Sequence, residues 1–252
     1  MHAPRLPFGA PSTITVTTMA DRNAALNLLT SNGMHAVLDV LLPAFRRATG
    51  KEVAVRYGTA QEILERIGAG ETADAVIAGR PALENLARAG KIDAASLRDL
   101  AASSVGVAVR SGLPKPDVSS VEAFKRALLA ADSIAFTGKG ASGIHFQKLI
   151  ATLGIADEVK AKAAMQDGGL VGELVVQGRA SMAVQQIPEL LAVPGLDYVG
   201  PLPSEIQLTS HIAAGVFAGS PRAADARALV EHLSSGENAA VYRAKGMQTE
   251  MG

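Results

Sequence analysis

The feature that most constrains the fold of this chain is a recurring unit: a short apolar run, a turn of small polar residues, and an amphipathic helix. In the first unit, Ala25–Leu29 is a short apolar run that indicates a buried strand. Thr30–Gly33 forms the turn, and apolar residues from Met34 to Phe45 recur at helical spacing until Gly50 ends the helix. Repeated strand–helix units predict a parallel sheet with helices on its faces.

Further units follow along the chain. In its first half, strands are expected at Val53–Tyr57, Asp74–Ala78 and Ser104–Val109, and helices at Gln61–Ile67 and Ala82–Ala89. The sequence SGLPKP at Ser111–Pro116 then breaks the pattern, and we interpret it as a linker. Beyond it the organisation repeats, with strands expected at Ser133–Phe136, Ala163–Gln166 and Ser181–Gln185. This repetition predicts a second lobe.

The last stretch is expected to return to the first lobe, with an alternating strand at Ile206–Phe217 and helices at Pro221–Leu233 and Glu237–Lys245. The predicted fold class is therefore α/β, with two lobes, each a mostly parallel sheet flanked by helices, and a ligand in the cleft between them. Residues 25–109 with 207–252 are expected to form the first lobe, and residues 110–206 the second. Residues 1–24 contain no apolar core of signal-peptide length, and we expect them to be a disordered extension, with a replaced leader as the alternative.

Composition excludes several classes of function. The 24 basic and 24 acidic residues balance, whereas a nucleic-acid-binding surface needs a basic excess. The chain contains no cysteine, which excludes disulfides, thiolate zinc sites and cysteine nucleophiles. Its five histidines show no metal-binding spacing, and no run approaches 18 apolar residues. We therefore expect no metal, no cofactor, no nucleic-acid partner and no membrane insertion.

Small residues at the carboxyl ends of the expected strands are the candidate ligand contacts. They are Ser31, Asn32, Thr59, Ala60, Ser142, Gly143, Gly168, Gly169 and Gln186. Ligands bind at this edge of open parallel sheets, and helix N-termini there offer free N–H groups and roughly half a positive charge. The set therefore suits a small anion. The alternative is that Ser31 or Asn32 only caps its helix, and that small turn residues are general in α/β folds.

Four segments carry a resemblance to a known family. They are SNGM at Ser31–Met34, YGTAQEILERIGAGETADAVI at Tyr57–Ile77, GASGIHF at Gly140–Phe146, and VGELVVQGRASMAVQQIPEL at Val171–Leu190. From Ala25 to its end, the chain resembles type 2 periplasmic solute-binding proteins, most closely their molybdate-binding branch. The resemblance implies two lobes joined by two crossing segments, a periplasmic location, a monomer, and delivery of the ligand to an ABC permease.

The same resemblance implies an anion held by hydroxyls and backbone amides. Carried over by position, it implies ligand contacts at Ser31, Ala60, Ser142, Gly168 and Gln186. Ala60 stands where the family has a serine, and Gln186 stands where the molybdate-binding proteins have a tyrosine. These two departures favour a ligand other than molybdate.

Basic side chains near the predicted cleft point to a carboxylate ligand. Arg80, Lys139 and His145 are candidate cationic donors, and the planar fork of an arginine suits a carboxylate. The alternatives are that Arg80 pairs with Glu84 one turn further along its helix and that Lys139 stays solvated.

The sequence is also similar to aconitate isomerase, an enzyme related to this branch that moves a proton within a tricarboxylate. That similarity implies an acid/base group, and His145 or His35 are the candidates because imidazole titrates near neutral pH. His35 alternatively is a partly buried helix residue. Three hypotheses follow: a solute-binding protein for a small oxyanion or organic acid, an isomerase on the same scaffold, and a cytoplasmic ligand sensor.

Overall fold

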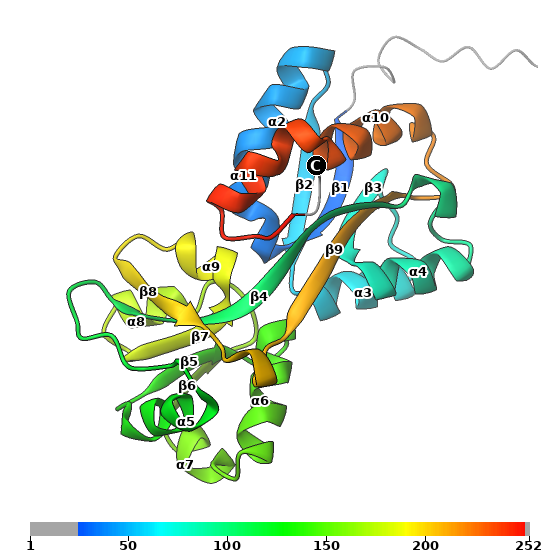
Figure 1. Ribbon diagram of the computed structural model, residues 1–252. Coiled ribbons are helices and arrows are strands. Elements are labelled where there is room, and N and C mark those ends of the chain that lie inside the picture. Colours follow the sequence, from blue (N-terminus) through cyan, green and yellow to red (C-terminus); the bar gives the residue numbers. More distant parts are fainter. Residues whose placement is uncertain (1–24, 250–252) are drawn as a thin grey trace, which may run out of the picture.

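Figure 1 shows a computed structural model of the protein, which describes residues 25–249. Two sheets, each flanked by helices, form two lobes that share the long strand β4 (Arg98–Arg110), so the predicted two-lobe α/β fold is confirmed. The extension predicted at residues 1–24 lies outside the described residues.

The first lobe is built from the two ends of the described chain. Its elements are β1 (Leu26–Ser31), η1 (Asn32–Met34), α2 (His35–Thr49), β2 (Val53–Gly58), α3 (Ala60–Gly68), β3 (Ala75–Gly79), α4 (Arg80–Arg88), η2 (Ala94–Ser96), β9 (Thr209–Val216), α10 (Ala223–Ser234), η4 (Gly236–Asn238) and α11 (Ala239–Ala244). The strand order is β2-β1-β3-β9-β4. β1 pairs in parallel with both β2 and β3, as the repeated units predict, and β9 returns antiparallel to β3.

The second lobe is a continuous stretch in the middle of the chain. Its elements are α5 (Val121–Ala130), β5 (Ile134–Thr137), α6 (Ala141–Thr152), α7 (Ala156–Lys160), β6 (Ala163–Gln166), α8 (Gly172–Val176), β7 (Met182–Gln186), α9 (Ile187–Leu191), β8 (Leu196–Pro201) and η3 (Ser204–Ile206). β5 is parallel to β6 and β7, while β7 and β8 flank β4 in antiparallel pairs. Sequence reasoning missed α7 and β8.

Strand β4 passes from one sheet to the other. Residues 98–104 pair with β9 in the first lobe, and residues 105–110 pair with β7 and β8 in the second. The strand begins at Arg98, six residues before the expected Ser104. The prediction began too late because Arg98 and Asp99 are exposed and interrupt the apolar pattern. The change of sheet falls between residues 104 and 105, whereas the predicted lobe boundary after residue 109 stays a prediction.

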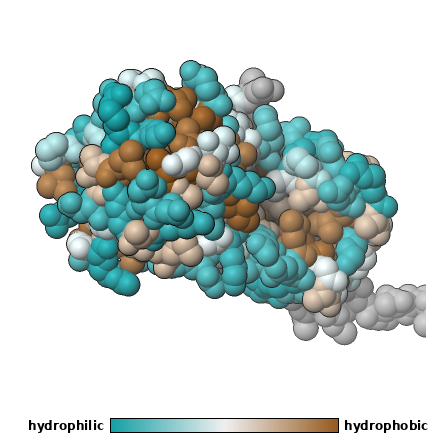
Figure 2. Space-filling model, turned by 90° about the horizontal axis from the view of Figure 1, so that it is seen from below, coloured by the Kyte–Doolittle hydropathy of each residue, from teal (hydrophilic) through white to brown (hydrophobic). Residues whose placement is uncertain are grey.

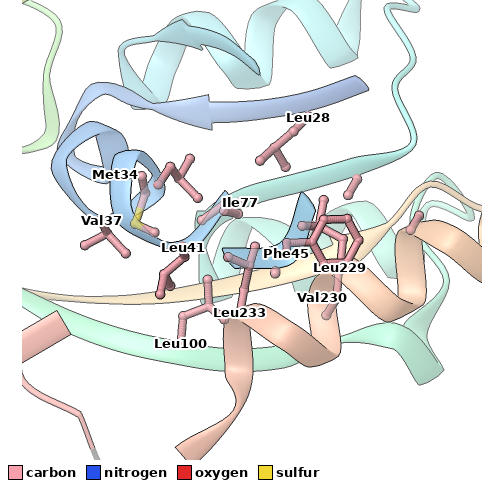
Figure 3. Packing of buried hydrophobic residues seen from close by; sticks show 14 of the residues in the cluster. Leu28, Met34, Val37, Leu41, Phe45, Ile77, Leu100, Leu229, Val230 and Leu233 are labelled. Atoms are coloured by element: carbon pink, nitrogen blue, oxygen red, sulfur yellow. The ribbon is translucent and has the colours of Figure 1, made fainter. Parts of the chain in front are cut away.

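Each lobe has its own hydrophobic core. In the first lobe, buried side chains of β1 and β3 face those of α2 and α10 (Figure 3), among them Leu28, Ile77, Leu41, Phe45 and Leu229. A second cluster around Phe124, Phe136 and Phe146 fills the other lobe. Burying one such side chain stabilises the fold by about 1.5–3 kcal/mol. Separate cores allow the lobes to move as two rigid bodies on either side of a ligand.

One face of the molecule shows how polar and apolar side chains are distributed on the surface. On the face seen in Figure 2, hydrophilic side chains cover most of the molecule and hydrophobic side chains form separate patches. None of the helices within residues 25–249 has both the length and the apolar character needed to cross a membrane.

Candidate functional site

A cavity of about 120 Å³ lies between the lobes, where strands from both sheets end. It has room for a small molecule, since one molecule of liquid water occupies ~30 Å³. The structure brings most of the predicted contacts to this interlobe cavity, namely Ser31, Asn32, Thr59, Ala60, Ser142, Gly168, Gly169 and Gln186. Ligand binding by these residues stays a prediction.

Ser31 ends β1 at the floor of the cavity. The next residues turn through η1 into α2, and Met34 is completely buried in the core beside Val37 (Figure 3), which fixes the position of the turn. Ser31 has the backbone position of a helix N-cap, yet its side chain makes no capping hydrogen bond. The capping alternative therefore does not account for the hydroxyl of Ser31, a residue that lines the cavity.

Thr59, on the neighbouring turn, is a helix cap. Its hydroxyl accepts a hydrogen bond from the N–H of Glu62 at 3.2 Å, and its own N–H donates to the Glu62 carboxylate at 2.7 Å. This capping box fixes the start of α3 and presents Ala60 to the cavity. At this turn, the structural interpretation accounts for the threonine.

The glycine-rich turn before α6 closes the other side of the cavity. A Cβ atom at Gly143 would lie 1.7 Å from the carbonyl oxygen of Thr137, so only glycine fits at this position. Gly143 does not line the cavity, which corrects its predicted role as a ligand contact. Ser142 is buried and lines the cavity near the N-terminus of the helix. The Thr137 hydroxyl is buried beside it without a hydrogen-bond partner among the described residues. Sequence reasoning did not select Thr137, which it placed in the turn after Ser133–Phe136, whereas the structure has it as the last residue of β5.

Two glutamines hold the back of the cavity. The Gln186 side chain accepts from the Ser103 hydroxyl at 2.6 Å and donates to the Ser210 hydroxyl at 3.4 Å, which connects β7 to the crossing strands β4 and β9. The Gln185 amide donates to the carbonyl oxygen of Gly169 at 2.7 Å. These bonds position the turns of the second lobe against the strands that join the lobes.

Glu189, which sequence reasoning did not select, also lines the cavity. It lies in the first turn of α9, directly after β7, and is half-buried. Burial raises the pKa of Glu189 to about 8, against hydrogen bonds from the Gln186 backbone and the Gln185 side chain, which lower it. Its position after a strand end was the available signal, since the same rule selected Gln186.

Arg80 does not line the cavity, which corrects its predicted role as a carboxylate contact. Its guanidinium bonds to Glu84 at 2.9 Å and to Asp99 at 2.8 Å, and these two partners raise the pKa of Arg80. The sequence alternative of pairing with Glu84 is therefore the observed one. Lys139 likewise pairs with Asp167 at 2.9 Å on the exposed surface.

The two candidate acid/base histidines also lie outside the cavity lining. His145 follows Ser142 on α6, but its Nε2 lies 2.9 Å from the carbonyl oxygen of Ile206. His35 stacks on Tyr57 with ring centroids 4.5 Å apart, and its Nδ1 lies 3.2 Å from the Asp39 carboxylate. Neither ring is placed to exchange a proton with a molecule in the cavity.

The described part of the cavity lining contains no lysine, arginine or histidine. Positive potential comes instead from the N-termini of α3 and α6, which begin at the lining residues Ala60 and Ala141. Hydroxyls of Ser31 and Ser142 add neutral donors. This arrangement can bind an anion through dipoles and hydrogen bonds, without a countercharge.

Comparisons with known proteins agree with this architecture. The sequence model of a family described as bacterial extracellular solute-binding protein matches residues 26–248. An aconitate isomerase from Pseudomonas sp is 33% identical over 229 residues, which cover 88% of this chain and 87% of that protein.

Solved structures show the same fold at low identity. The periplasmic molybdate-binding protein of Azotobacter vinelandii has a TM-score of 0.74 at 16% identity, covering 89% of this chain and 99% of that one. The sulfate-binding protein of Mycobacterium tuberculosis has a TM-score of 0.68 at 16% identity, covering 90% and 88%.

Proposed function

Because the chain belongs to the bacterial extracellular solute-binding proteins, we propose that it captures a small organic acid in its interlobe cavity. The observation that carries this proposal is the mixed lining of the cavity. The lining includes hydroxyl-bearing residues and helix N-termini from both lobes, and it also includes apolar residues, among them the partly exposed Ile212. A ligand with a charged end and a carbon skeleton matches this mixture.

The apolar residues in the lining argue against a bare tetrahedral oxyanion. Oxygen atoms of such an ion point in all directions, and each needs a donor. An oxygen left against Ile212, which lines the cavity and is partly exposed, would lose its hydration without compensation, at a cost of about 1–3 kcal/mol. Ala60, which stands where the resembled family has a serine, removes one donor from the lining. A carboxylic acid can turn its oxygens to Ser31 and Ser142 and its carbon atoms to the apolar residues.

The wider role in this proposal is uptake. The captured acid would pass to an ABC permease, and the protein would work as a periplasmic monomer that closes its lobes on the ligand. Family membership and the two separate cores support this role, since lobe closure around a ligand is a known form of domain motion.

Calorimetric and thermal titration with a panel of anions tests the proposal. The panel contains citrate, cis- and trans-aconitate, molybdate, tungstate and sulfate. A ligand at 100 times its dissociation constant should raise the free energy of unfolding by about 2.7 kcal/mol. The Ser31→Ala variant tests whether the ligand binds in the interlobe cavity, since it should weaken any binding there. Stabilisation by molybdate or tungstate alone would overturn the assignment to organic acids.

A second candidate function is isomerisation of a small unsaturated acid on the same scaffold. Two observations favour it: the 33% identity to an aconitate isomerase, and the single ionisable group in the described cavity lining, Glu189. A carboxyl with a pKa of about 8 holds a proton at neutral pH and exchanges it readily, as an acid/base group must. The ionised fraction of this group can accept a proton from one carbon of the substrate and return the same proton to another carbon, which regenerates the carboxylate.

The assay for this candidate incubates each aconitate isomer with the protein and follows the products by chromatography. Running the reaction in D₂O adds a second readout, because proton removal and return incorporates deuterium. We expect Glu189→Gln to abolish conversion, and His145→Ala to leave it unaffected because that imidazole is outside the cavity lining. Tight binding with no conversion over hours would contradict the isomerase function and remain compatible with the uptake role.

A further inference from the structure

Glu189 is the only side chain with an ionisable carboxyl, amine or imidazole among the described residues that line the interlobe cavity. It is carried by α9, which starts directly at the end of β7 in the second lobe. A Cβ atom built on Gly33 of the first lobe would lie 3.8 Å from the Glu189 Cγ. The carboxyl-bearing side chain therefore reaches the first-lobe turn that also presents Ser31.

The groups around Glu189 supply no countercharge. η1 and β7, which pack against α9, contain no titratable residue. The other packed strands, β4 and β8, carry Arg98, Asp99, Arg110, Asp197 and Tyr198. A neighbouring groove, which shares Pro188 with the cavity lining, is lined by His35, Asp39 and Lys245. None of these side chains belongs to the described lining of the cavity, so a charged Glu189 would have no cation beside it there.

This arrangement conflicts with anion binding unless a proton is present. A carboxylate and a bound anion in the same enclosed space repel each other, and no neighbouring cation relieves the repulsion. A neutral carboxyl removes the repulsion, and its O–H group can donate a hydrogen bond to the anion. The nearby amide of Gln185 and the N–H of Gln186 remain as partners for its other oxygen.

We infer that the cavity binds its anion together with one proton, which Glu189 carries as a hydrogen-bond donor to the ligand. The inference rests on the proposed function, because it concerns an acid bound in the same cavity. It adds the chemical form that is recognised: an anion with a free acceptor oxygen directed at α9, in a site that is neutral before binding. Glu189 thereby becomes a residue that determines specificity.

The raised pKa of Glu189, about 8, agrees with this inference and sets its pH range. Below pH 7 nearly every molecule already holds the proton, so affinity should hardly change with pH. Above pH 8 binding must first restore the proton, so the apparent dissociation constant should rise about tenfold per pH unit. Between pH 6 and pH 9 the expected loss is therefore about tenfold.

Isothermal titration with trans-aconitate and with citrate at pH 6, 7, 8 and 9 measures this loss. Repeating each titration in two buffers with different ionisation enthalpies counts the protons taken up with the ligand. We expect no uptake at pH 6 and close to one proton per ligand at pH 9. In Glu189→Gln, the amide donates at every pH, so the ratio of dissociation constants between pH 9 and pH 6 should fall to near one. If the dissociation constant of this variant still differs between pH 9 and pH 6, the difference reports titration of the ligand itself.

A matched control is Glu173→Gln, which removes one carboxylate from the exposed surface of α8 in the same lobe. It should keep the tenfold pH effect and the proton uptake. Equal pH profiles for the wild type and Glu189→Gln would overturn the inference while leaving organic-acid binding intact. An absence of binding at pH 6 in the wild type and in both variants would instead overturn the proposed function, and the inference with it.

Discussion

Gly168 of the second lobe lies so close to Thr59 of the first that a Cβ atom on the glycine would be 2.6 Å from the Thr59 Cγ2. Both residues line the interlobe cavity, and Thr59 is fixed by its capping box with Glu62. The lobes therefore touch at a point where one partner has no side chain. This contact is what allows the cavity to be enclosed from two sides.

Gly168→Ala should weaken ligand binding without unfolding the protein. Gly168 does not have a positive φ, so alanine is compatible with its backbone, and the added methyl group collides only across the cleft. Overpacking of this kind costs about 1–3 kcal/mol, which we expect as reduced affinity in calorimetry with citrate or trans-aconitate. Gly138→Ala is the control, because its nearest heavy atom would be 3.6 Å away. Equal affinities in the two variants would contradict closure through this contact.

Ser31→Ala and Thr59→Ala should separate binding from capping. The Ser31 hydroxyl makes no capping bond, so its removal should lower affinity by about 1–3 kcal/mol while leaving the urea midpoint unchanged. The Thr59 hydroxyl caps α3, so its removal should lower the free energy of unfolding by about 1 kcal/mol. A stability loss in Ser31→Ala with normal binding would restore the capping interpretation.

Much of this fold could be predicted because its signals are local. Buried strands such as β1 and β3 contain short apolar runs, and Gly50 ends α2 in a left-handed conformation that favours glycine. The start of β4 at Arg98 could not be predicted in this way, because its pairing with β9 depends on residues more than a hundred positions away. Strand β8 was hidden for a similar reason, since prolines and glycines surround a short run that is stabilised by pairing with β4.

The candidate site shows where sequence reasoning fails. Strand ends selected Ser31, Ser142 and Gln186, because the carboxyl ends of parallel strands meet at one edge of a sheet. Side-chain direction is not a local property, however. Arg80 also follows a strand, yet Glu84 and Asp99 draw its guanidinium away from the cavity, while Glu189 was passed over although it faces inward.

Arg80→Lys should leave ligand affinity within about twofold of the wild type. The substitution keeps the charge and removes the planar fork, which would matter only if the guanidinium bound a carboxylate. Since Arg80 is bonded to Glu84 and Asp99, the change should be confined to a surface ion pair, worth about 0–1 kcal/mol of stability. Titration with citrate checks this expectation. A tenfold weaker complex would mean that the arginine reaches the ligand after closure.

The ligand-free protein should become less stable as pH rises from about 4.5 to about 8, through Glu189. The unfolded carboxyl loses its proton near its ordinary pKa of 4.5, whereas the folded one keeps it up to a pKa of about 8. Between these values the folded state binds more protons than the unfolded state. The free energy of unfolding must then fall with pH, by at most ~1.4 kcal/mol per pH unit for one group. Above pH 8 and below pH 4.5 this contribution is flat.

Urea denaturation of the wild type and Glu189→Gln at pH 4, 6, 8 and 9.5 isolates this contribution, because every other titrating group is common to both proteins. The free energy of unfolding of the variant should increase relative to that of the wild type between pH 4 and pH 8. From pH 8 to pH 9.5 the difference between the two proteins should stay constant. Glu173→Gln, on the exposed face of α8, should show no such growing difference. Parallel pH profiles for the wild type and Glu189→Gln would mean that the carboxyl ionises freely in the folded protein. The cavity would then hold a negative charge at neutral pH, and an anion could enter only by bringing its own proton.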